Sequence, residues 1–198
     1  MRRLVPFIAA LVLAAVVVVG LSQAGGKSGD SAARGPRFDL RASLERLAGP
    51  PAPPAPLAAL HRQANALLGG GRGALRARLR NLRGHPVVVN KWASWCSPCR
   101  AEFPVFQRVA TDRGRTVAFV GLDAEDKAPA AKRFLAERPL PYPSYDDPDQ
   151  SLARTLKAPD VAPVTVFLDA KGRTAFIHSG QYTSAAQLSG DIDRYLRG

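Results

Sequence analysis

The sequence predicts an α/β layered domain, on the strength of three observations. Short β-branched segments alternate with helical ones between residues 84 and 198. Residues 164–168 and 174–178 read as strands joined by a DAKG turn, which favours a hairpin. Hydrophobic residues make up 46% of the 198 residues, enough to bury a core. The order of these segments predicts a βαβ unit fused to a ββα unit.

The first 21 residues read as a membrane segment. After Met1-Arg2-Arg3, residues 4–21 carry no charge, and as a helix they would span about 27 Å. The two arginines predict a cytoplasmic amino terminus with the remainder of the chain outside the cytoplasm. We expect an uncleaved single-pass anchor; the alternative is a cleaved signal peptide, because Ser22-Gln23-Ala24 offers small residues to a peptidase.

Residues 22–83 separate this segment from the main domain. Residues 22–37 are rich in Gly and Ser and predict a flexible linker. Residues 38–83 predict a helical, proline-rich extension, in which residues 49–56 form a polyproline segment. Its predicted helices cover residues 38–48, 57–68 and 74–82.

Residues 84–198 form the main domain, and the spacing of their hydrophobic residues predicts its strands and helices. Residues 87–92 and 116–122 read as buried strands. The predicted helices run from the cysteine motif to about residue 112, then over residues 128–138, 151–157 and 184–196.

The net charge of +12 comes from 28 Lys and Arg against 16 Asp and Glu. The densest run of cations is Arg72, Arg76, Arg78, Arg80 and Arg83. No nucleic-acid motif accompanies this run, and aromatic residues do not alternate with it. We therefore expect no nucleic-acid partner, and interpret the run as a solvated basic helix or as one attracted to an anionic membrane surface.

The two cysteines, Cys96 and Cys99, lie between a predicted strand and a predicted helix in the segment WASWCSPC. At this spacing they can close a small disulfide ring. The positive end of the helix dipole would stabilise a thiolate at Cys96, which makes it the nucleophile. Cys99 would resolve the mixed disulfide, while Pro98 restricts the backbone between them.

A metal site and a purely structural disulfide are the alternatives. Two cysteines exclude a four-cysteine zinc site, and the three histidines show no ligand spacing. We therefore expect no metal and no cofactor. A disulfide across three residues adds little loop entropy, so the pattern favours redox exchange.

Residues 87–104 (VVVNKWASWCSPCRAEFP) resemble the thioredoxin-like proteins of the TlpA/ResA group, which are membrane-anchored or exported thiol–disulfide oxidoreductases of bacteria. The resemblance continues through residues 142–148, 161–167 and 169–173. It implies a thioredoxin-like fold, with a central mixed β-sheet flanked by helices.

Three site features come from this resemblance. Pro163, preceded by Ala162, matches the family's cis-proline, which helps dock the substrate backbone; a trans proline starting an edge strand is the alternative. Glu102 matches an acidic residue that could move the thiol proton, or it is a first-turn residue complementing the helix dipole. Trp95 is expected in the apolar substrate surface, and Trp92 in the core.

The sequence also departs from related patterns. Asn90 occupies the position of the buried Asp of cytoplasmic thioredoxins, and Lys91 stands where an aromatic residue is common. On a central strand Lys91 must snorkel or pair, and near the sulfurs it would lower their pKa. Residues 38–83 do not resemble the family's amino-terminal strands.

The resemblance implies an extracytoplasmic thiol–disulfide oxidoreductase working as a reductase on protein thiols and disulfides. A membrane thiol–disulfide donor would supply its electrons, and cytochrome c maturation is the family's familiar task. Two alternatives stay open: an oxidant that donates disulfides, and a thioredoxin-fold binding module without catalysis.

Overall fold

The computed structural model describes residues 37–196, and Phe38–Gly198 forms one compact unit. The predicted anchor (residues 1–21) and nearly all of the predicted linker (residues 22–37) lie outside the described residues. Among the helices that are described, none is long and apolar enough to cross a membrane.

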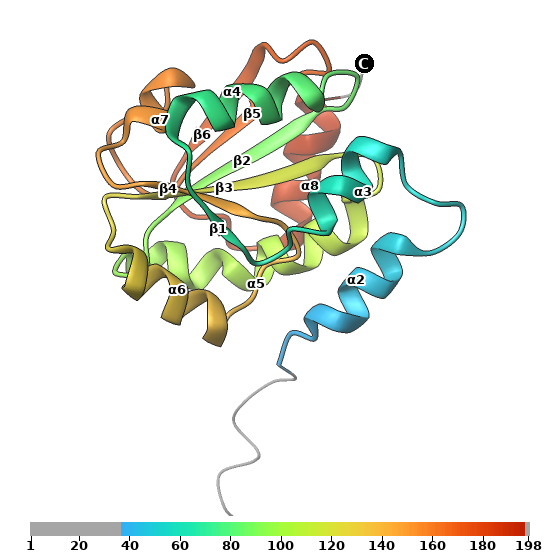
Figure 1. Cartoon of the computed structure of the whole chain (residues 1–198), viewed down its shortest axis with the longest axis horizontal. Helices are drawn as coiled ribbons and strands as arrows, with labels where there is room; N and C mark the ends of the chain where they lie inside the picture. Colours follow the sequence, from blue (N-terminus) through green and yellow to red (C-terminus); the bar gives the residue numbers. More distant parts are fainter. Residues whose placement is uncertain (1–36, 197–198) are drawn as a thin grey trace, which may run out of the picture. The chain divides into compact units, whose positions relative to one another are not determined.

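The compact unit is built on a six-stranded mixed sheet in the order β1-β4-β3-β2-β5-β6 (Figure 1). Its strands are β1 (Leu67–Leu68), β2 (Val87–Trp92), β3 (Ala118–Ala124), β4 (Ser144–Asp147), β5 (Val164–Leu168) and β6 (Thr174–Ser179). The four strands β1 to β4 run parallel to one another, whereas β5 pairs antiparallel with both β2 and β6. The predicted mixed α/β sheet is therefore confirmed.

Helices cover both faces of the sheet (Figure 1). They are α2 (Leu40–Ala48), α3 (Ala55–His61), α4 (Gly71–Asn81), α5 (Ser97–Arg113), α6 (Ala128–Glu137), α7 (Ser151–Thr155) and α8 (Ala185–Tyr195). One core cluster joins the sheet to α5, α6 and α8, around Trp92, Phe103 and Phe134. A second cluster joins the other face to α3, α4 and α7.

The central strand β2 determines where the chemistry lies. All six of its side chains are buried, because it has a strand on each side and a helical layer on each face. Val88 and Trp92 face the α5 layer, whereas Val87 and Val89 face the α4 layer. The carboxyl ends of the parallel strands β2, β3 and β4 therefore meet at one edge, where the cysteine loop begins.

The prediction of a helix over residues 57–68 is wrong beyond His61. The backbone of Asn65 has a positive φ of 60°, which a continuing helix does not allow. Its side-chain amide donates to the carbonyl of Leu135 at 3.2 Å, and its oxygen accepts from the Leu140 N–H at 3.0 Å. Leu67 and Leu68 then pair with β4 as an edge strand, so part of the extension belongs to the sheet.

Strand β4 is absent from the predicted elements because its sequence, SYDD, is mostly polar. The structure satisfies these polar side chains inside the fold. The Trp92 Nε1–H donates to Ser144 Oγ at 3.1 Å, and the Asp147 carboxylate accepts the Leu152 and Ala153 N–H groups, each at 2.8 Å. Asp147 thus helps to hold the start of α7 against the strand.

Candidate active site

Cys96 and Cys99 lie where β2 passes into α5. Cys96 has extended backbone angles and is the residue from which α5 starts at Ser97. Its Sγ accepts the Cys99 N–H at 3.3 Å, and its carbonyl accepts the Arg100 N–H at 3.0 Å. The unpaired N–H groups and the positive dipole end of a 17-residue helix therefore point at this sulfur, which favours its thiolate form. Pro98 fits the first turn, where no helical N–H bond is lost.

The two cysteines are joined by a disulfide, with a Cα–Cα distance of 5.3 Å. Cys96 has 4% of its surface exposed and Cys99 has none. This difference is what the predicted roles require, since the attacking sulfur must meet a substrate and the resolving sulfur need not.

The Ala162–Pro163 peptide bond is cis, as the sequence predicts. Pro163 immediately precedes β5, and Val164 pairs with Lys91 near the end of β2. This register brings the cis-proline to the sheet edge from which the cysteine loop leaves. The backbone before Pro163 is therefore available beside the cysteines.

Two exposed apolar side chains stand beside the site residues in the chain: Trp95 directly before Cys96, and Val161 directly before Ala162. These are the large hydrophobic side chains most exposed among the described residues, at 61% and 54%. The Trp95 indole N–H donates to the Glu125 carbonyl at 2.9 Å, which orients the ring although it is exposed. Val161 was not among the predicted site residues; its place just before Ala162 is the sequence signal that could have found it.

Glu102 is fully buried in the second turn of α5, so the alternative of a first-turn dipole residue is wrong. Oε1 accepts the Asn90 Nδ2–H at 2.8 Å, and Oε2 accepts the Tyr182 N–H at 3.1 Å. Burial raises the pKa of Glu102 to about 7, although both hydrogen bonds act in the opposite direction. Its carboxyl group is therefore poised near neutrality, one helical turn after Cys99.

Arg100 adds a positive charge beside the cysteine loop. Its guanidinium donates to the Ser94 carbonyl at 3.1 Å and lies 4.7 Å from the centre of the Phe134 ring. A cation in this position favours a thiolate on the same loop. The sequence prediction did not include Arg100, since an arginine after a cysteine motif carries no signal of where it points.

Asp123 is a second buried acid that the sequence did not predict. Its side chain is fully buried, and no N–H group donates to either carboxyl oxygen. Its carboxyl group is hydrogen-bonded to that of Asp126, and Asp146 lies directly opposite on β4. Burial, followed by the charges of Asp126 and Asp146, raises the pKa of Asp123 to about 8. Asp126 in turn accepts the Ser94 N–H at 2.5 Å, so this acidic group borders the cysteine loop.

Lys91 does not lie with the cysteines. It alternates with Asn90 and Trp92 and so points to the face of the sheet that carries α4. Its Nζ donates to the Pro159 carbonyl at 2.8 Å, and burial lowers the pKa of Lys91. The Lys91 side chain is therefore paired inside the fold, as predicted for a lysine on a central strand, and is not placed to lower the pKa of the cysteines.

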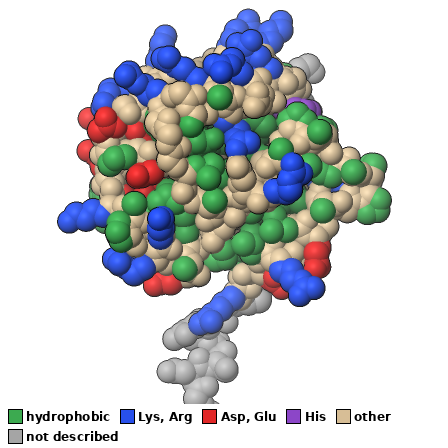
Figure 2. Space-filling model, viewed as in Figure 1, with side chains coloured by type: hydrophobic (Ala, Val, Ile, Leu, Met, Phe, Trp, Pro, Cys, Tyr) green, Lys and Arg blue, Asp and Glu red, His purple; other side chains and the backbone are tan. Residues whose placement is uncertain are grey.

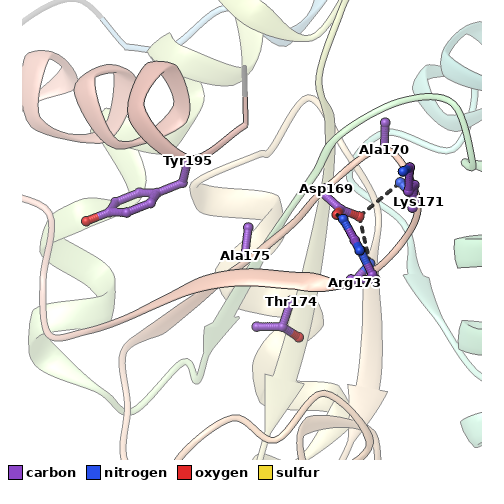
Figure 3. A pocket seen from close by; sticks show the side chains of 7 residues that line it. All are labelled: Asp169, Ala170, Lys171, Arg173, Thr174, Ala175 and Tyr195. Atoms are coloured by element: carbon purple, nitrogen blue, oxygen red, sulfur yellow. Dashed lines mark hydrogen bonds and ion pairs between the residues drawn. The ribbon is translucent and has the colours of Figure 1, made fainter. Parts of the chain in front are cut away.

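A surface hollow lies away from this site, between the β5–β6 turn and Tyr195 (Figure 3). The Asp169 carboxylate accepts the N–H groups of Lys171 and Arg173, each at 2.9 Å, and the Arg173 Nε–H at 2.8 Å. These bonds hold the hairpin turn, and they leave the hollow without a free acid or nucleophile. We assign it no chemistry.

A family profile described as Redoxin matches residues 75–190, more than half of the chain. The chain belongs to the Redoxin family. The thioredoxin-like family predicted from the sequence is thereby confirmed.

The relatives of this chain are named for thiol–disulfide chemistry. This chain is 42% identical over 93 residues to the thiol:disulfide interchange protein DsbE of Pseudomonas fluorescens biotype C, covering 46% of this chain and 50% of that protein. It is 28% identical over 120 residues to the thiol-disulfide oxidoreductase ResA of Bacillus anthracis, covering 60% and 68%. The chain thus spans about half the length of the DsbE relative.

Solved structures agree with the fold of this Redoxin domain. A secreted Mycobacterium tuberculosis disulfide oxidoreductase homologous to E. coli DsbE superposes with a TM-score of 0.52 at 27% identity, covering 58% of this chain and 85% of that one. A DsbF homologue from Corynebacterium diphtheriae gives a TM-score of 0.51 at 30% identity, covering 59% and 75%.

Proposed function

We propose that this chain is an extracytoplasmic, membrane-anchored thiol–disulfide oxidoreductase that reduces protein disulfides through Cys96 and Cys99. The observation that carries the proposal is the buried cysteine pair at the start of α5, beside a cis-proline and directly after the exposed Trp95 in the chain. The names of the DsbE and ResA relatives support the same chemistry.

In the proposed cycle the reduced protein meets a substrate disulfide. The Cys96 thiolate attacks one substrate sulfur, the substrate S–S bond breaks, and the first substrate thiolate leaves. The Cys99 thiolate then attacks Cys96 Sγ, which releases the second substrate thiolate and forms the Cys96–Cys99 disulfide. The substrate gains two electrons and two protons, and the cysteine pair loses them.

Glu102 is proposed to move the proton in the second step. Cys99 must lose its proton before it attacks, and it is fully buried, so water does not reach it freely. A carboxyl group with a pKa of about 7, one turn along the same helix, can accept that proton and later return it. Asn90 and the Tyr182 N–H hold the carboxylate in place.

The substrate is proposed to lie across Trp95, Val161 and the backbone of Ala162 and Pro163. An extended peptide would bond to the backbone before the cis-proline, while the two exposed apolar side chains contact its side chains. Pro98 is proposed to shape the approach to Cys96.

Reduction consumes electrons, so the oxidised pair must be reduced again. A membrane thiol–disulfide electron donor is the proposed source, since residues 1–21 are predicted to hold the chain at the membrane. Disulfides in apocytochrome c are the proposed substrates, because cytochrome c maturation is the task implied by the TlpA/ResA resemblance.

Trapping of the mixed disulfide tests the exchange mechanism. Without the resolving thiol, Cys99→Ser should accumulate a covalent complex with exported proteins, resolved on non-reducing gels and released by dithiothreitol. Cys96→Ser is the matched control and should trap far less, because Cys99 is the more buried sulfur. Equal trapping by both variants would refute the assigned roles, and trapping by neither would favour a binding module.

A further inference from the structure

Helix α4 carries a row of exposed cations on its outward face. Leu75 and Leu82 are buried against the sheet, whereas the opposite side of the helix is exposed. Positions i, i+4, i+8 and i+11 fall on one side of a helix. Four exposed arginines occupy these positions and the turn that follows: Arg72, Arg76, Arg80 and Arg83.

The neighbouring helix widens this face. Helix α7 packs against α4 and contributes the exposed Arg154, whose charge also acts on Asp149. The exposed Lys157 follows this helix. Figure 2 shows Lys and Arg side chains gathered along this edge of the molecule. We call the set Arg72, Arg76, Arg80, Arg83, Arg154 and Lys157 the basic face.

Acidic residues do not neutralise the four arginines of α4. No Asp or Glu occurs in the sequence between Glu45 and Glu102. Within the described part of the chain, the ion pairs formed by arginine involve other residues. Arg78, the fifth arginine of the run, turns inward and donates to Tyr145 Oη at 3.2 Å.

This arrangement opposes helix formation. Like charges four residues apart destabilise a helix, and Arg72, Arg76 and Arg80 form two such pairs. The helix also begins at two glycines, with no side chain capping its first turn. The fold tolerates this repulsion, and a partner of opposite charge would relieve it.

We propose that the basic face binds the headgroups of an anionic phospholipid bilayer. A bilayer is a flat, extended polyanion, which matches cations spread over two adjacent helices and attracts each arginine near its surface. The predicted anchor at residues 1–21 would hold the domain close to such a surface.

Nucleic acid is the other polyanion, and the face fits it less well. The exposed side of α4 carries no aromatic residue on which bases could stack, and α4 contains only Asn81 as a neutral hydrogen-bonding side chain. The cysteine site lies with α5, on the opposite side of the sheet from α4. Docking through the basic face would therefore leave Cys96 accessible to protein substrates.

The proposal rests on the membrane location of the proposed function but not on its redox chemistry. The test uses the full chain reconstituted in nanodiscs, either of phosphatidylcholine alone or with about one-third phosphatidylglycerol. Hydrogen–deuterium exchange of residues 71–83 should slow only in the anionic nanodiscs, and the slowing should disappear in high salt. Each arginine removed should lower the ratio of docked to undocked domain about fivefold.

Two variants, each lacking four positive charges, distinguish binding through the basic face from a general effect of net charge. Arg72→Gln, Arg76→Gln, Arg80→Gln and Arg83→Gln together should abolish the protection. Lys127→Gln, Lys132→Gln, Arg133→Gln and Arg138→Gln, exposed residues in and next to α6, should preserve it. Circular dichroism checks that both variants fold.

Equal exchange of residues 71–83 in the two lipids would overturn the proposal, and so would protection that survives in the first variant. Protection that appears only when duplex DNA is added to zwitterionic nanodiscs would assign the face to nucleic acid instead. Mixed-disulfide trapping by Cys99→Ser is measured separately, so failure of docking and failure of the redox function give different results.

Discussion

Replacing Asp123 by asparagine should stabilise the protein, and the gain should increase with pH. The Asp123 carboxyl is fully buried, receives no hydrogen bond from an N–H group, and faces Asp146 across the β3–β4 pair. The fold raises its pKa from an ordinary 3.8 to about 8. Between these two pH values the unfolded chain has released the Asp123 proton, so folding requires the carboxyl group to bind a proton again.

Proton linkage gives the direction and the magnitude of the stability difference between wild type and Asp123→Asn. Because the folded pKa is raised, the stability linked to this group is complete below pH 3.8 and is lost as pH rises through about 8. One pKa unit corresponds to about 1.4 kcal/mol, so wild type should lose about 1.4 kcal/mol per pH unit relative to Asp123→Asn. Between pH 5 and pH 7 the difference should grow by about 3 kcal/mol.

Urea unfolding of the full chain in mild detergent, followed by tryptophan fluorescence at several pH values, measures this difference. Trp92 is fully buried, so its emission reports unfolding of the core. Glu102 also titrates in this range, but its effect is common to both proteins and cancels in the difference.

Asp147→Asn is the matched control. Asp147 is also buried on β4, but its carboxylate accepts two backbone N–H groups. Its replacement should lower the free energy of unfolding by about 1–3 kcal/mol. A stability difference between wild type and Asp123→Asn that stays constant from pH 5 to pH 7, or a less stable Asp123→Asn, would refute the reasoning.

Three further predictions concern the site. Glu102→Gln should slow disulfide exchange about a hundredfold and flatten its pH dependence near pH 7, measured by stopped-flow fluorescence, because a buried group with a pKa of about 7 is lost. Trp95→Ala should weaken binding of a disulfide-containing peptide about tenfold, because the exposed ring is lost. Its free energy of unfolding should stay within about 0.5 kcal/mol of wild type. Lys91→Met should leave the Cys96 thiol pKa unchanged in a thiolate absorbance titration, since Lys91 faces the other layer.

Each of these has an outcome that would count against it. Exchange by Glu102→Gln with wild-type rate and pH profile would remove the proton-transfer role. Unaltered peptide affinity in Trp95→Ala would place the substrate elsewhere. A Cys96 pKa that rises in Lys91→Met would show that the ammonium acts on the sulfur across the sheet.

The parts of the fold that sequence predicts well are those with a strong local pattern. Residues 87–92 are a continuous β-branched run, and the structure makes them the central strand. The predicted hairpin turn ends at Gly172, whose φ is +79°, a conformation that glycine adopts readily in turns. The resemblance also predicts the cis bond before Pro163, because that proline has a fixed place in the family.

Long-range contacts explain what the sequence does not reveal. The helix predicted over residues 57–68 is cut short because Asn65 bonds to residues more than sixty positions away. Strand β4 is polar in composition but buried, since Ser144 and Asp147 find partners on other elements. No local pattern records such partners.

The acids show the same limit within the site. Glu102 is found from its position after Cys99, but its burial depends on Asn90 and Tyr182 from distant segments. Asp123 reads as an ordinary acid at a strand end. Only the register of β3 with β4 shows that it faces Asp146, and only the packing shows that no N–H group donates to its oxygens.

The reduction potential of the Cys96–Cys99 couple tests the proposed reductase most directly. It would be measured on the full chain equilibrated in graded dithiothreitol and glutathione buffers, with the redox state read by thiol alkylation. The proposal predicts a value near or below that of thioredoxin, about −270 mV. A value approaching that of DsbA, about −120 mV, would contradict it and identify a disulfide donor.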